Sequence, residues 1–332
     1  MIAVDANGAD RGPAAVAAGA SRAGLPVLLF GPRALVEPHA GPDVEVVDAP
    51  ETVKAGEEAV SSVRSKRDAS IVQAARAVGN GRAAALVSAG STGPTLAAAT
   101  LSVKRLRGVF RPALAVLLPV PGGPVLLLDA GASVEVRPEH LVQFAYMGAS
   151  FMEAVVGIER PRVGLLSVGE ESGKGTSDVL MAHDRLAEAT TLNFAGNVEG
   201  FDIPAAGVSV VVADGFTGNV ALKVLEGTIR SVGQEIRSRL GSGAVSSLGG
   251  LLARGALRSM RDDLDPERVG GAILLGLRKP VVVAHGSFGP VGIEHAVRLA
   301  ARAVDEDMVG RTAAALEAAG ALRSAPAASV AD

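Results

Sequence analysis

Six short loops of this chain combine glycine with side chains that can bind or transfer charged groups. Each loop follows a run of apolar residues and mixes Gly with Asp, Ser, Thr, Asn, Lys or His. Such loops at the carboxyl ends of buried strands are where α/β proteins bind ligands, although a single Gly-rich loop also makes an ordinary tight turn. Together they predict a binding site at one edge of a sheet. The six loops are Asp5–Asp10, Ser88–Gly93, Asp129–Ser133, Ser167–Gly175, Asp214–Asn219 and His285–Gly289.

Two of these loops, Ser88–Gly93 and Asp214–Asn219, have the composition of an anion-binding helix start. Gly beside Ser or Thr exposes backbone N–H groups, and the helix dipole adds positive potential. Lys174 and Lys223 can supply full positive charge, although Lys223 taken alone is better interpreted as a solvated helix lysine. His285 ends an apolar run, so it either caps the following turn or faces a ligand as a hydrogen-bond donor or general acid–base.

Several common catalytic motifs are absent from the sequence. Gly173-Lys174 lacks the first Gly and the Ser or Thr of a P-loop, and there is no GxSxG nucleophile turn and no GxGxxG after the first strand. No two His residues have helical i, i+4 spacing for a metal. The acidic residues of the loops have two interpretations. They either surround Mg²⁺, or they cap helices or orient Lys and His, and we favour capping and orientation. These residues are Asp5, Asp10, Asp129, Glu170 and Asp214.

The elements that must position these loops follow from an alternation of apolar runs and Ala-rich helical segments. The runs are continuous, as in strands buried on both faces, so the sequence predicts an α/β fold with a mostly parallel sheet covered on both sides. The predicted strands are Ile2–Val4, Val27–Phe30, Val44–Val47, Ala84–Val87, Ala113–Leu118, Val125–Leu128, Val163–Leu166, Val208–Ala213 and Val281–Ala284, the fifth and sixth forming a hairpin. The clearest helices are Pro13–Ala23, Ser70–Val78, Glu139–Val156 and Asp178–Ala187. Residues 1–320 are predicted to form a single domain, and 321–332 a disordered tail.

The composition of the chain excludes several classes of function. The 332 residues are 48% hydrophobic and carry a net charge of −3, which argues against a general nucleic-acid binder. The absence of Cys removes disulfides and thiolate chemistry. No leader pattern precedes the first strand, and Pro121-Gly-Gly-Pro124 interrupts the longest apolar stretch. We therefore expect a soluble cytoplasmic protein.

Several longer motifs lie in order along nearly the whole chain. The most specific are Gly196-Asn-Val-Glu-Gly200 and Asp214-Gly-Phe-Thr-Gly-Asn-Val-Ala-Leu-Lys223, with Ile2-Ala-Val-Asp-Ala6, Gly169-Glu-Glu171 and Ala284-His-Gly-Ser287 among the others. With these motifs the chain resembles the bacterial phosphate acyltransferases, the PlsX-type enzymes of fatty acid and phospholipid synthesis. The resemblance implies a three-layer α/β/α sandwich like that of isocitrate and isopropylmalate dehydrogenases and of phosphotransacetylases.

The resemblance also implies a reaction and its partners. An acyl group passes from acyl carrier protein to inorganic phosphate, in a homodimer that touches the membrane and delivers acyl phosphate to a glycerol-3-phosphate acyltransferase. Phosphate is itself a nucleophile and a thiolate leaves easily, so no cofactor, metal or protein nucleophile is required. An anion cradle and oxyanion donors are needed, and the predicted catalytic residues are Lys174, Asn219, His285 and Asp214. The predicted phosphate- and substrate-binding residues are Ser88, Gly90, Ser91, Thr92, Gly93, Asn197, Glu199, Gly215, Thr217, Gly218, Lys223, Gly286 and Ser287.

The chain departs from the family pattern at several positions, among them Asn7, Arg11, Ala69, Phe201 and Phe288, and three further departures share one change. Ser91, Ser133 and Ser167 stand where the family usually has Asn, and a hydroxyl has less reach and one donor fewer than an amide. The departures leave open an enzyme with another acyl or carrier preference, a weakly active paralogue, and a scaffold that binds carrier protein or lipid without turnover. A metal- and NAD-dependent decarboxylating dehydrogenase of the same fold is the alternative enzyme.

A helical projection is predicted over about residues 229–266. Between Gly241 and Asp263, apolar residues lie at helical spacing beside an Arg-rich edge, and two short helices are expected to meet near Gly249-Gly250. The segment is either buried in a dimer interface or touches an anionic membrane, and the family resemblance favours the membrane. The residues predicted to contact the membrane or a partner are Leu248, Leu251, Leu252, Arg254 and Arg258.

Overall fold

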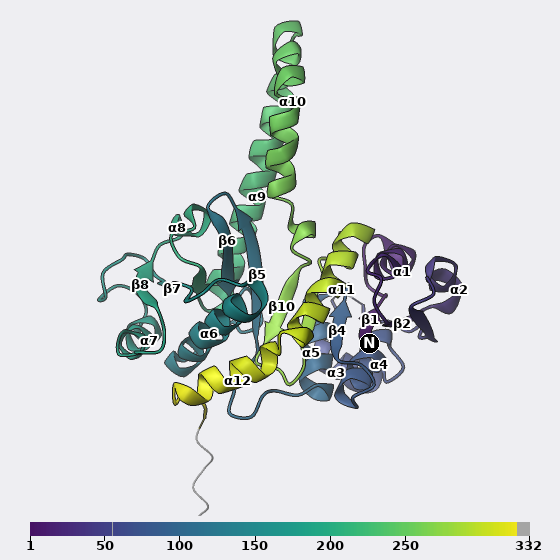
Figure 1. The fold of residues 1–332 in the computed structure, drawn as a ribbon, viewed down its shortest axis with the longest axis horizontal. Coiled ribbons are helices and arrows are strands. Elements are labelled where there is room, and N and C mark those ends of the chain that lie inside the picture. Colours follow the sequence, from purple (N-terminus) through teal and green to yellow (C-terminus); the bar gives the residue numbers. More distant parts are fainter. Residues whose placement is uncertain (55, 324–332) are drawn as a thin grey trace, which may run out of the picture.

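The computed structural model describes residues 1–54 and 56–323 and is built on an 11-stranded sheet with the order β3-β2-β1-β4-β11-β10-β5-β6-β9-β7-β8. Helices cover both faces of this sheet (Figure 1). The strands are β1 (Ile2–Asp5), β2 (Val27–Gly31), β3 (Val44–Asp48), β4 (Ala85–Ser88), β5 (Ala113–Val120), β6 (Gly123–Leu128), β7 (Val163–Leu166), β8 (Phe194–Val198), β9 (Val210–Val212), β10 (Ala272–Leu275) and β11 (Val281–Val283).

Alternate side chains of the strands enter two separate cores, one on each face of the sheet. Val4 and Leu29 pack with α1, α6, α11 and α12, while Ala3 and Leu28 pack with α3, α4 and α5. This arrangement is the three-layer α/β/α architecture that the apolar runs predict. The helices are α1 (Gly12–Arg22), α2 (Arg33–Val36), α3 (Ala59–Ser65), α4 (Ser70–Gly79), α5 (Thr92–Ser102), α6 (Pro138–Phe151), α7 (Ser177–Ala187), α8 (Asp202–Ala205), α9 (Gly215–Leu240), α10 (Ala244–Asp263), α11 (Pro290–Asp305) and α12 (Met308–Ala318).

The sheet is mostly parallel, as predicted, but its two halves run in opposite directions. Strands β1, β2, β3, β4 and β11 are parallel to one another, and so are β6, β7, β8 and β9. Between these halves, β10 is antiparallel to β11 and to β5, and β5 is antiparallel to β6. Three successive reversals leave the second half opposed to the first.

Two strands were not predicted from the sequence. In β8 the polar Asn197 and a left-handed Gly196 (φ 92°) interrupt the apolar pattern, and β10 is a four-residue strand directly after Gly270 and Gly271. The predicted strand Val208–Ala213 is shorter in the structure, and the predicted helix Glu139–Val156 is α6 followed by one π-helical turn, Met152–Val156. The interrupted apolar pattern explains why β8 was not predicted, because a continuous apolar run is the signal of a buried strand.

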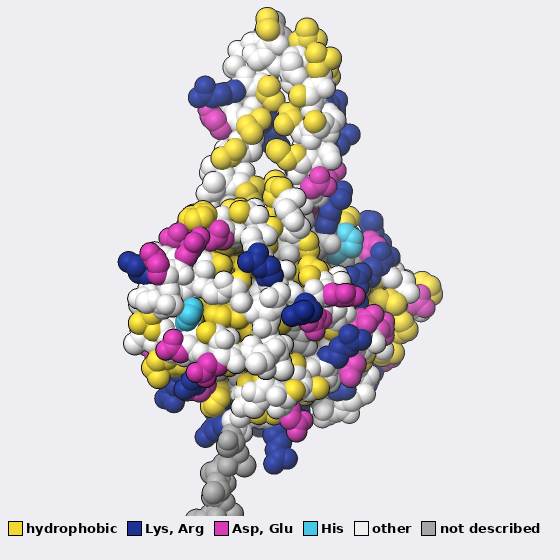
Figure 2. Space-filling view, turned by 60° about the vertical axis from the view of Figure 1, so that its left-hand side comes forward, with side chains coloured by type: hydrophobic (Ala, Val, Ile, Leu, Met, Phe, Trp, Pro, Cys, Tyr) yellow, Lys and Arg dark blue, Asp and Glu magenta, His cyan; other side chains and the backbone are white. Residues whose placement is uncertain are grey.

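The projection is an antiparallel pair formed by the outer half of α9 and by α10 (Figure 1). The expected joint at Gly249-Gly250 is wrong: the helices meet at residues 241–243, and α10 continues through both glycines. A Cβ on Gly250 would lie 3.2 Å from Leu240 Cβ, so the glycine lets the two helices approach closely. Hydrophobic side chains are visible along the projection in Figure 2.

The start of the predicted tail is ordered. The backbone N–H of Arg323 donates to the Gly108 carbonyl (2.9 Å), and the Gln143 side chain donates to the Ala321 carbonyl (2.8 Å). Residues 321–323 therefore pack against the domain, and the rest of the predicted tail, 324–332, lies outside the described residues. No described helix is long and apolar enough to cross a membrane.

The contact between α1 and α11 predicts how stability responds to an added methyl group. A Cβ on Gly19 would lie 2.6 Å from the Pro290 carbonyl oxygen and 2.6 Å from Ile293 Cβ, so Gly19→Ala must push α1 from α11. We expect a loss of about 1–3 kcal/mol in the free energy of unfolding, measured by urea titration. The matched control Gly233→Ala, in open space on α9, is expected to gain about 0.5–1 kcal/mol. Equal stability of the two variants would contradict this packing.

Candidate active site

Three polar loops lie side by side at the ends of β1, β4 and β11. The strands β4 and β11 are adjacent and parallel, and the Ala284 N–H donates to the Ser88 carbonyl (2.9 Å). The Asp10 N–H donates to the Gly286 carbonyl (2.9 Å). The loops Asp5–Asp10, Ser88–Gly93 and His285–Gly289 therefore form one group, which we call the first loop group.

The N-terminus of α5 is open within the first loop group. Ser91 is its N-cap residue in an extended conformation, and its side chain makes no capping hydrogen bond. Within the described residues, the N–H groups of Ser91, Thr92 and Gly93 have no hydrogen-bond partner. Unpaired N–H groups and the positive end of the helix dipole are the features that bind a phosphate or carboxylate.

His285 is exposed in another loop of the same group. Its Nδ1 accepts the Ser287 N–H (3.3 Å) and lies 2.8 Å from Ser287 Oγ. In the neutral ring this contact leaves the proton on Nε2, which is then the atom that can donate to a ligand. His285 thus caps the turn through one nitrogen and keeps the other available, so the two interpretations from the sequence are compatible.

A buried polar network supports the Ser88–Gly93 turn from below. Asp5 Oδ2 accepts the Ser88 hydroxyl (2.9 Å), and Ser88 Oγ in turn accepts the Gly90 N–H (3.2 Å) and lies 3.1 Å from Thr95 Oγ1. Burial raises the pKa of Asp5 to about 6, against the hydrogen bonds from Ser70, Ser88 and Asn7 that lower it. Sequence reasoning named Asp5 as an acidic loop residue but missed this network, because Thr95 and Ser70 lie in helices with no motif of their own.

A second loop group surrounds Asp129 and the start of α9. Asp129 is fully buried, and its carboxylate accepts four backbone N–H groups, from Leu114, Gly131, Ala132 and Ser133, at 2.7–3.1 Å. Burial nevertheless raises the pKa of Asp129. Gly218 lies against the Asp129 carbonyl so closely that a Cβ there has no room. A Cβ on Gly215 would likewise lie 2.6 Å from the Ser133 carbonyl oxygen, so both glycines let α9 pack closely against the loop.

The predicted anion cradle at Asp214–Asn219 is already filled by a carboxylate. Asp214 is the N-cap of α9 and accepts the Thr217 N–H (2.8 Å) and hydroxyl (2.6 Å). Asn219 Nδ2 donates to the Ala130 carbonyl (3.0 Å), and exposed Lys223 pairs with Glu226 (2.9 Å). A carboxylate at the helix end repels a further anion. Of the two predicted cradles, the structure leaves the one at α5 open.

A third loop group is the Ser167–Gly175 loop with β8. The buried Asn197 donates through Nδ2 to the carbonyls of Glu171 (2.8 Å) and Lys174 (3.3 Å), and Ser167 Oγ donates to the Lys174 carbonyl (2.8 Å). Asn197 Oδ1 is buried with no partner among the described residues. Glu199 donates its N–H to Asp202 Oδ2 (2.8 Å). The Lys174 backbone is held while its side chain is exposed.

The sequence predicted that the six loops gather at one edge of the sheet, and this prediction is wrong. The strand reversals put the ends of β1, β4 and β11 at the opposite end of the hydrogen-bond ladder from those of β6, β7 and β9. The predicted site residues are divided accordingly among the three groups. Asp129 and Asp214 cap backbone N–H groups, as favoured from the sequence, and no metal-ligand cluster of three or more His, Cys, Asp or Glu occurs in the described chain.

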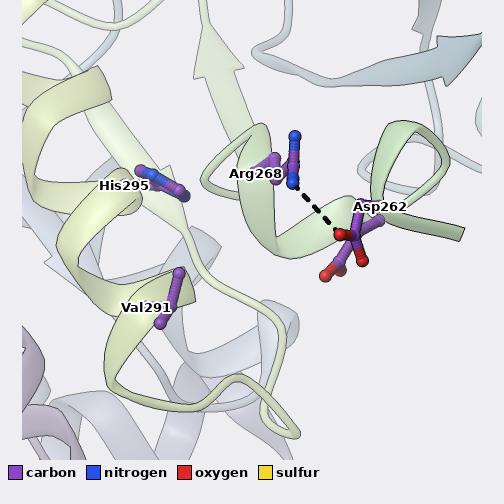
Figure 3. A pocket seen from close by; sticks show the side chains of 5 residues that line it. Asp262, Arg268, Val291 and His295 are labelled. Carbon is purple, nitrogen blue, oxygen red and sulfur yellow. Dashed lines mark ion pairs between the residues drawn. The ribbon is translucent and has the colours of Figure 1, made fainter. Parts of the chain in front are cut away.

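A separate cavity of about 460 Å³ lies at the base of the projection (Figure 3). Arg268 lies 3.6 Å from Asp262 across it, and His295 faces it from α11. The neighbouring Glu267 accepts the Gly289 N–H (3.0 Å) and bonds through its carbonyl to His295 Nδ1 (2.8 Å). The base of the projection is thus tied to α11, but none of the predicted site residues lines this cavity.

Known proteins resemble this chain in sequence and in fold. A family model described as fatty acid synthesis protein matches residues 1–311. A phosphate acyltransferase from Thermobifida fusca (strain YX) is 45% identical over 312 residues, 90% of this chain and 86% of the relative. The EutD phosphotransacetylase from Staphylococcus aureus (TM-score 0.56, 18% identity) covers 92% of this chain and 94% of its own. A 4-hydroxythreonine-4-phosphate dehydrogenase from Klebsiella pneumoniae (TM-score 0.52, 15% identity) covers 92% and 99%.

The family model and the curated relative define an acyltransferase enzyme of fatty acid synthesis. The chain belongs to the fatty acid synthesis protein family, which confirms the resemblance to phosphate acyltransferases seen in its motifs. The two solved structures, at under 25% identity, support the fold alone. The likeness to isocitrate and isopropylmalate dehydrogenases and the roles of individual residues stay predictions.

The raised pKa of Asp5 gives a prediction for stability against pH. A carboxyl whose folded pKa is about 6, against about 3.9 unfolded, stabilises the fold fully below pH 4 and loses that contribution as pH rises through 6. Asp5→Asn removes this titration. Between pH 3 and pH 7.5, the free energy of unfolding of the wild type should fall by about 3 kcal/mol relative to the variant. Parallel urea-titration curves for the two proteins would contradict the assignment.

Proposed function

We propose that the protein transfers an acyl group from the thioester of acyl carrier protein to inorganic phosphate, releasing acyl phosphate and the free carrier for phospholipid synthesis. The observation that carries this proposal is the open N-terminus of α5, with three unpaired N–H groups in the same loop group as His285. The name phosphate acyltransferase of the 45% identical relative supports the same reaction. A cytoplasmic location is part of the proposal.

In this mechanism the N–H groups of Ser91, Thr92 and Gly93 hold phosphate with one oxygen directed at the thioester carbon. That oxygen forms the new C–O bond, and the C–S bond then breaks to release the carrier thiolate, which takes up a proton. The His285 Nε2–H donates to the developing oxyanion or to the departing sulfur, where such a donor is most effective. Holding both reactants at one helix end also supplies alignment.

The three Ser residues that stand in place of the family's usual Asn differ in their importance for this proposal. Ser167 replaces an amide but still donates to the Lys174 carbonyl, and Ser133 contacts Asp129 through its backbone. Ser91 has a free, exposed side chain at the helix end where phosphate is proposed to bind. A change of activity or acyl preference therefore depends most on Ser91, and a weakly active paralogue remains the alternative outcome of an activity assay.

We further propose that the projection touches an anionic membrane. Leu248 (60% exposed), Leu251 (62%) and Leu252 (81%) on α10 are unusually accessible for leucine, and Arg254 and Arg258 are exposed further along the same helix. An apolar surface flanked by Arg favours shallow insertion into anionic lipid. Burial of the same leucines in a homodimer is the competing outcome. Transfer of the product to a glycerol-3-phosphate acyltransferase stays a prediction.

The proposed phosphate cradle predicts the effect of removing one N–H group. Thr92 is the first residue of α5, and Ser91 before it is extended (φ −62°, ψ 142°), so proline fits at this position without disturbing the helix. Thr92→Pro deletes one N–H donor to phosphate, and we expect the phosphate KM to rise at least about tenfold, since a charge-assisted hydrogen bond is worth about 1.5–3 kcal/mol. Hydroxylamine trapping of acyl phosphate measures the rate.

Thr92→Ala is the matched control because it removes the same side chain and keeps the N–H group. Its phosphate KM should stay near that of the wild type. Lys174→Ala gives the opposing test, since the sequence predicted that Lys174 assists phosphate. A raised KM in Lys174→Ala together with an unchanged KM in Thr92→Pro would place phosphate in the third loop group instead.

His285 is predicted to act in the chemical step rather than in phosphate binding. His285→Ala should lower kcat about 10²–10³-fold, as loss of an oxyanion donor does, with a smaller change in phosphate KM. Ser287→Ala, which removes only the neighbouring hydroxyl, is the control. If His285→Ala retains most of kcat, the residue serves the turn alone.

The membrane proposal is tested by liposome flotation with anionic vesicles. The double substitution Leu251→Glu and Leu252→Glu adds two negative charges at exposed positions of α10, so flotation should be lost while the oligomeric state, measured by light scattering, is unchanged. A variant that floats as before, or that changes its oligomeric state, would show that these leucines do not contact lipid.

A further inference from the structure

A buried acid lies directly behind the proposed phosphate cradle. Asp5 is 2% exposed, and a Cβ on Gly90 would stand only 3.6 Å from Asp5 Oδ2. Gly90 is followed at once by Ser91, Thr92 and Gly93, whose N–H groups form the cradle. An anion held there is therefore separated from the Asp5 carboxyl by a single turn of backbone.

No positive charge compensates Asp5 within the described residues. The groups that face it are the Ser70 hydroxyl from α4, the Ser88 hydroxyl from β4 and the Asn7 N–H of its own loop, and β2 contributes the apolar Phe30 at the paired position. The titratable side chains of the adjoining segments, Asp10, Arg11, Glu51 and His285, are all exposed to solvent. Their charges are screened, whereas that of Asp5 is not.

We propose that Asp5 takes up a proton when an oxyanion binds at the N-terminus of α5, so that the two negative charges do not coexist across the turn. The inference rests on the proposed function for the location of the anion. The step is the addition of one solvent proton to the Asp5 carboxylate, with no other bond changed. Burial already raises the pKa of this carboxyl to about 6. The approach of a further negative charge raises this pKa again, through neutral pH.

The hydrogen-bond network can accommodate both protonation states. With Asp5 ionised, the Ser88 hydroxyl donates to Asp5 Oδ2 and its oxygen accepts the Gly90 N–H. With Asp5 protonated, the carboxyl donates to Ser88 Oγ, and the Ser88 hydroxyl turns to donate a hydrogen bond to Thr95 Oγ1, which can donate to the Ser91 carbonyl (3.0 Å). Ser88 Oγ accepts the Gly90 N–H in both cases, so the turn keeps its shape and only the direction of the relay changes.

Titration calorimetry of the full chain with sulfate tests this coupling, because sulfate does not itself titrate near neutral pH. The binding heat is measured at pH 7 in buffers of different ionisation enthalpy, which gives the number of protons taken up per anion. We expect up to about one proton for the wild type and none for Asp5→Asn. At pH 8 the variant should bind sulfate about tenfold more tightly, because Asn supplies the same donor as the protonated acid without a charge. Asp43→Asn, an exposed acid removed in the same way, should behave as the wild type.

Two outcomes would overturn the inference, and they are distinguishable from each other. Sulfate bound without proton uptake, or with equal uptake in Asp5→Asn, would show that Asp5 does not respond to the anion, while the cradle itself stands. Binding that is absent, or unchanged in Thr92→Pro, would place the anion away from α5 and would overturn both the inference and the proposed phosphate site. A role of Asp5 in folding alone would change stability but not the proton count.

Discussion

Three antiparallel pairings, β11 with β10, β10 with β5 and β5 with β6, separate the two parallel halves of the sheet. The direction of each strand determines at which end of the sheet the following polar loop lies. The loops after β1, β4 and β11 consequently assemble into one group, while those after β6 and β9 meet around Asp129. The same residue types therefore leave an open helix N-terminus in one half and form a closed structural joint in the other.

The two buried aspartates show how local backbone decides what a carboxylate does. Asp129 accepts four N–H groups and fixes a loop against Gly215 and Gly218, so its charge is used in holding structure. Asp5 accepts one N–H and otherwise contacts hydroxyls, which can reverse their hydrogen-bond direction when it is protonated. Hydroxyl groups can hydrogen-bond to either the ionised or the protonated carboxyl, because they both donate and accept. Four N–H donors can only donate, so they favour the ionised carboxylate alone. Only Asp5 is thus suited to answer a change of charge nearby.

The sequence predicted the parts of this fold that depend on local pattern. Apolar runs gave nine of the strands in place, and Gly-rich segments gave the loops, because burial and turn geometry act over a few residues. The direction of a strand depends on its partners, so the opposed halves could not be derived from runs alone. Likewise, composition made Ser88–Gly93 and Asp214–Asn219 equivalent, and the capping hydrogen bond that the Thr217 N–H donates to Asp214 distinguishes them.

The N-terminus of α5 is open because the Ser91 side chain makes no capping hydrogen bond. An N-cap serine commonly accepts an N–H from the first helical turn, and here that hydrogen bond is not made, so the helix end remains unsatisfied in the described structure. The turn keeps this conformation because Ser88 holds Gly90 from behind and Thr95 holds the Ser91 carbonyl. Support from buried hydroxyls replaces the missing cap. The stability that a cap would contribute is thus available to a ligand, which is the physical reason that we propose an anion at this helix end.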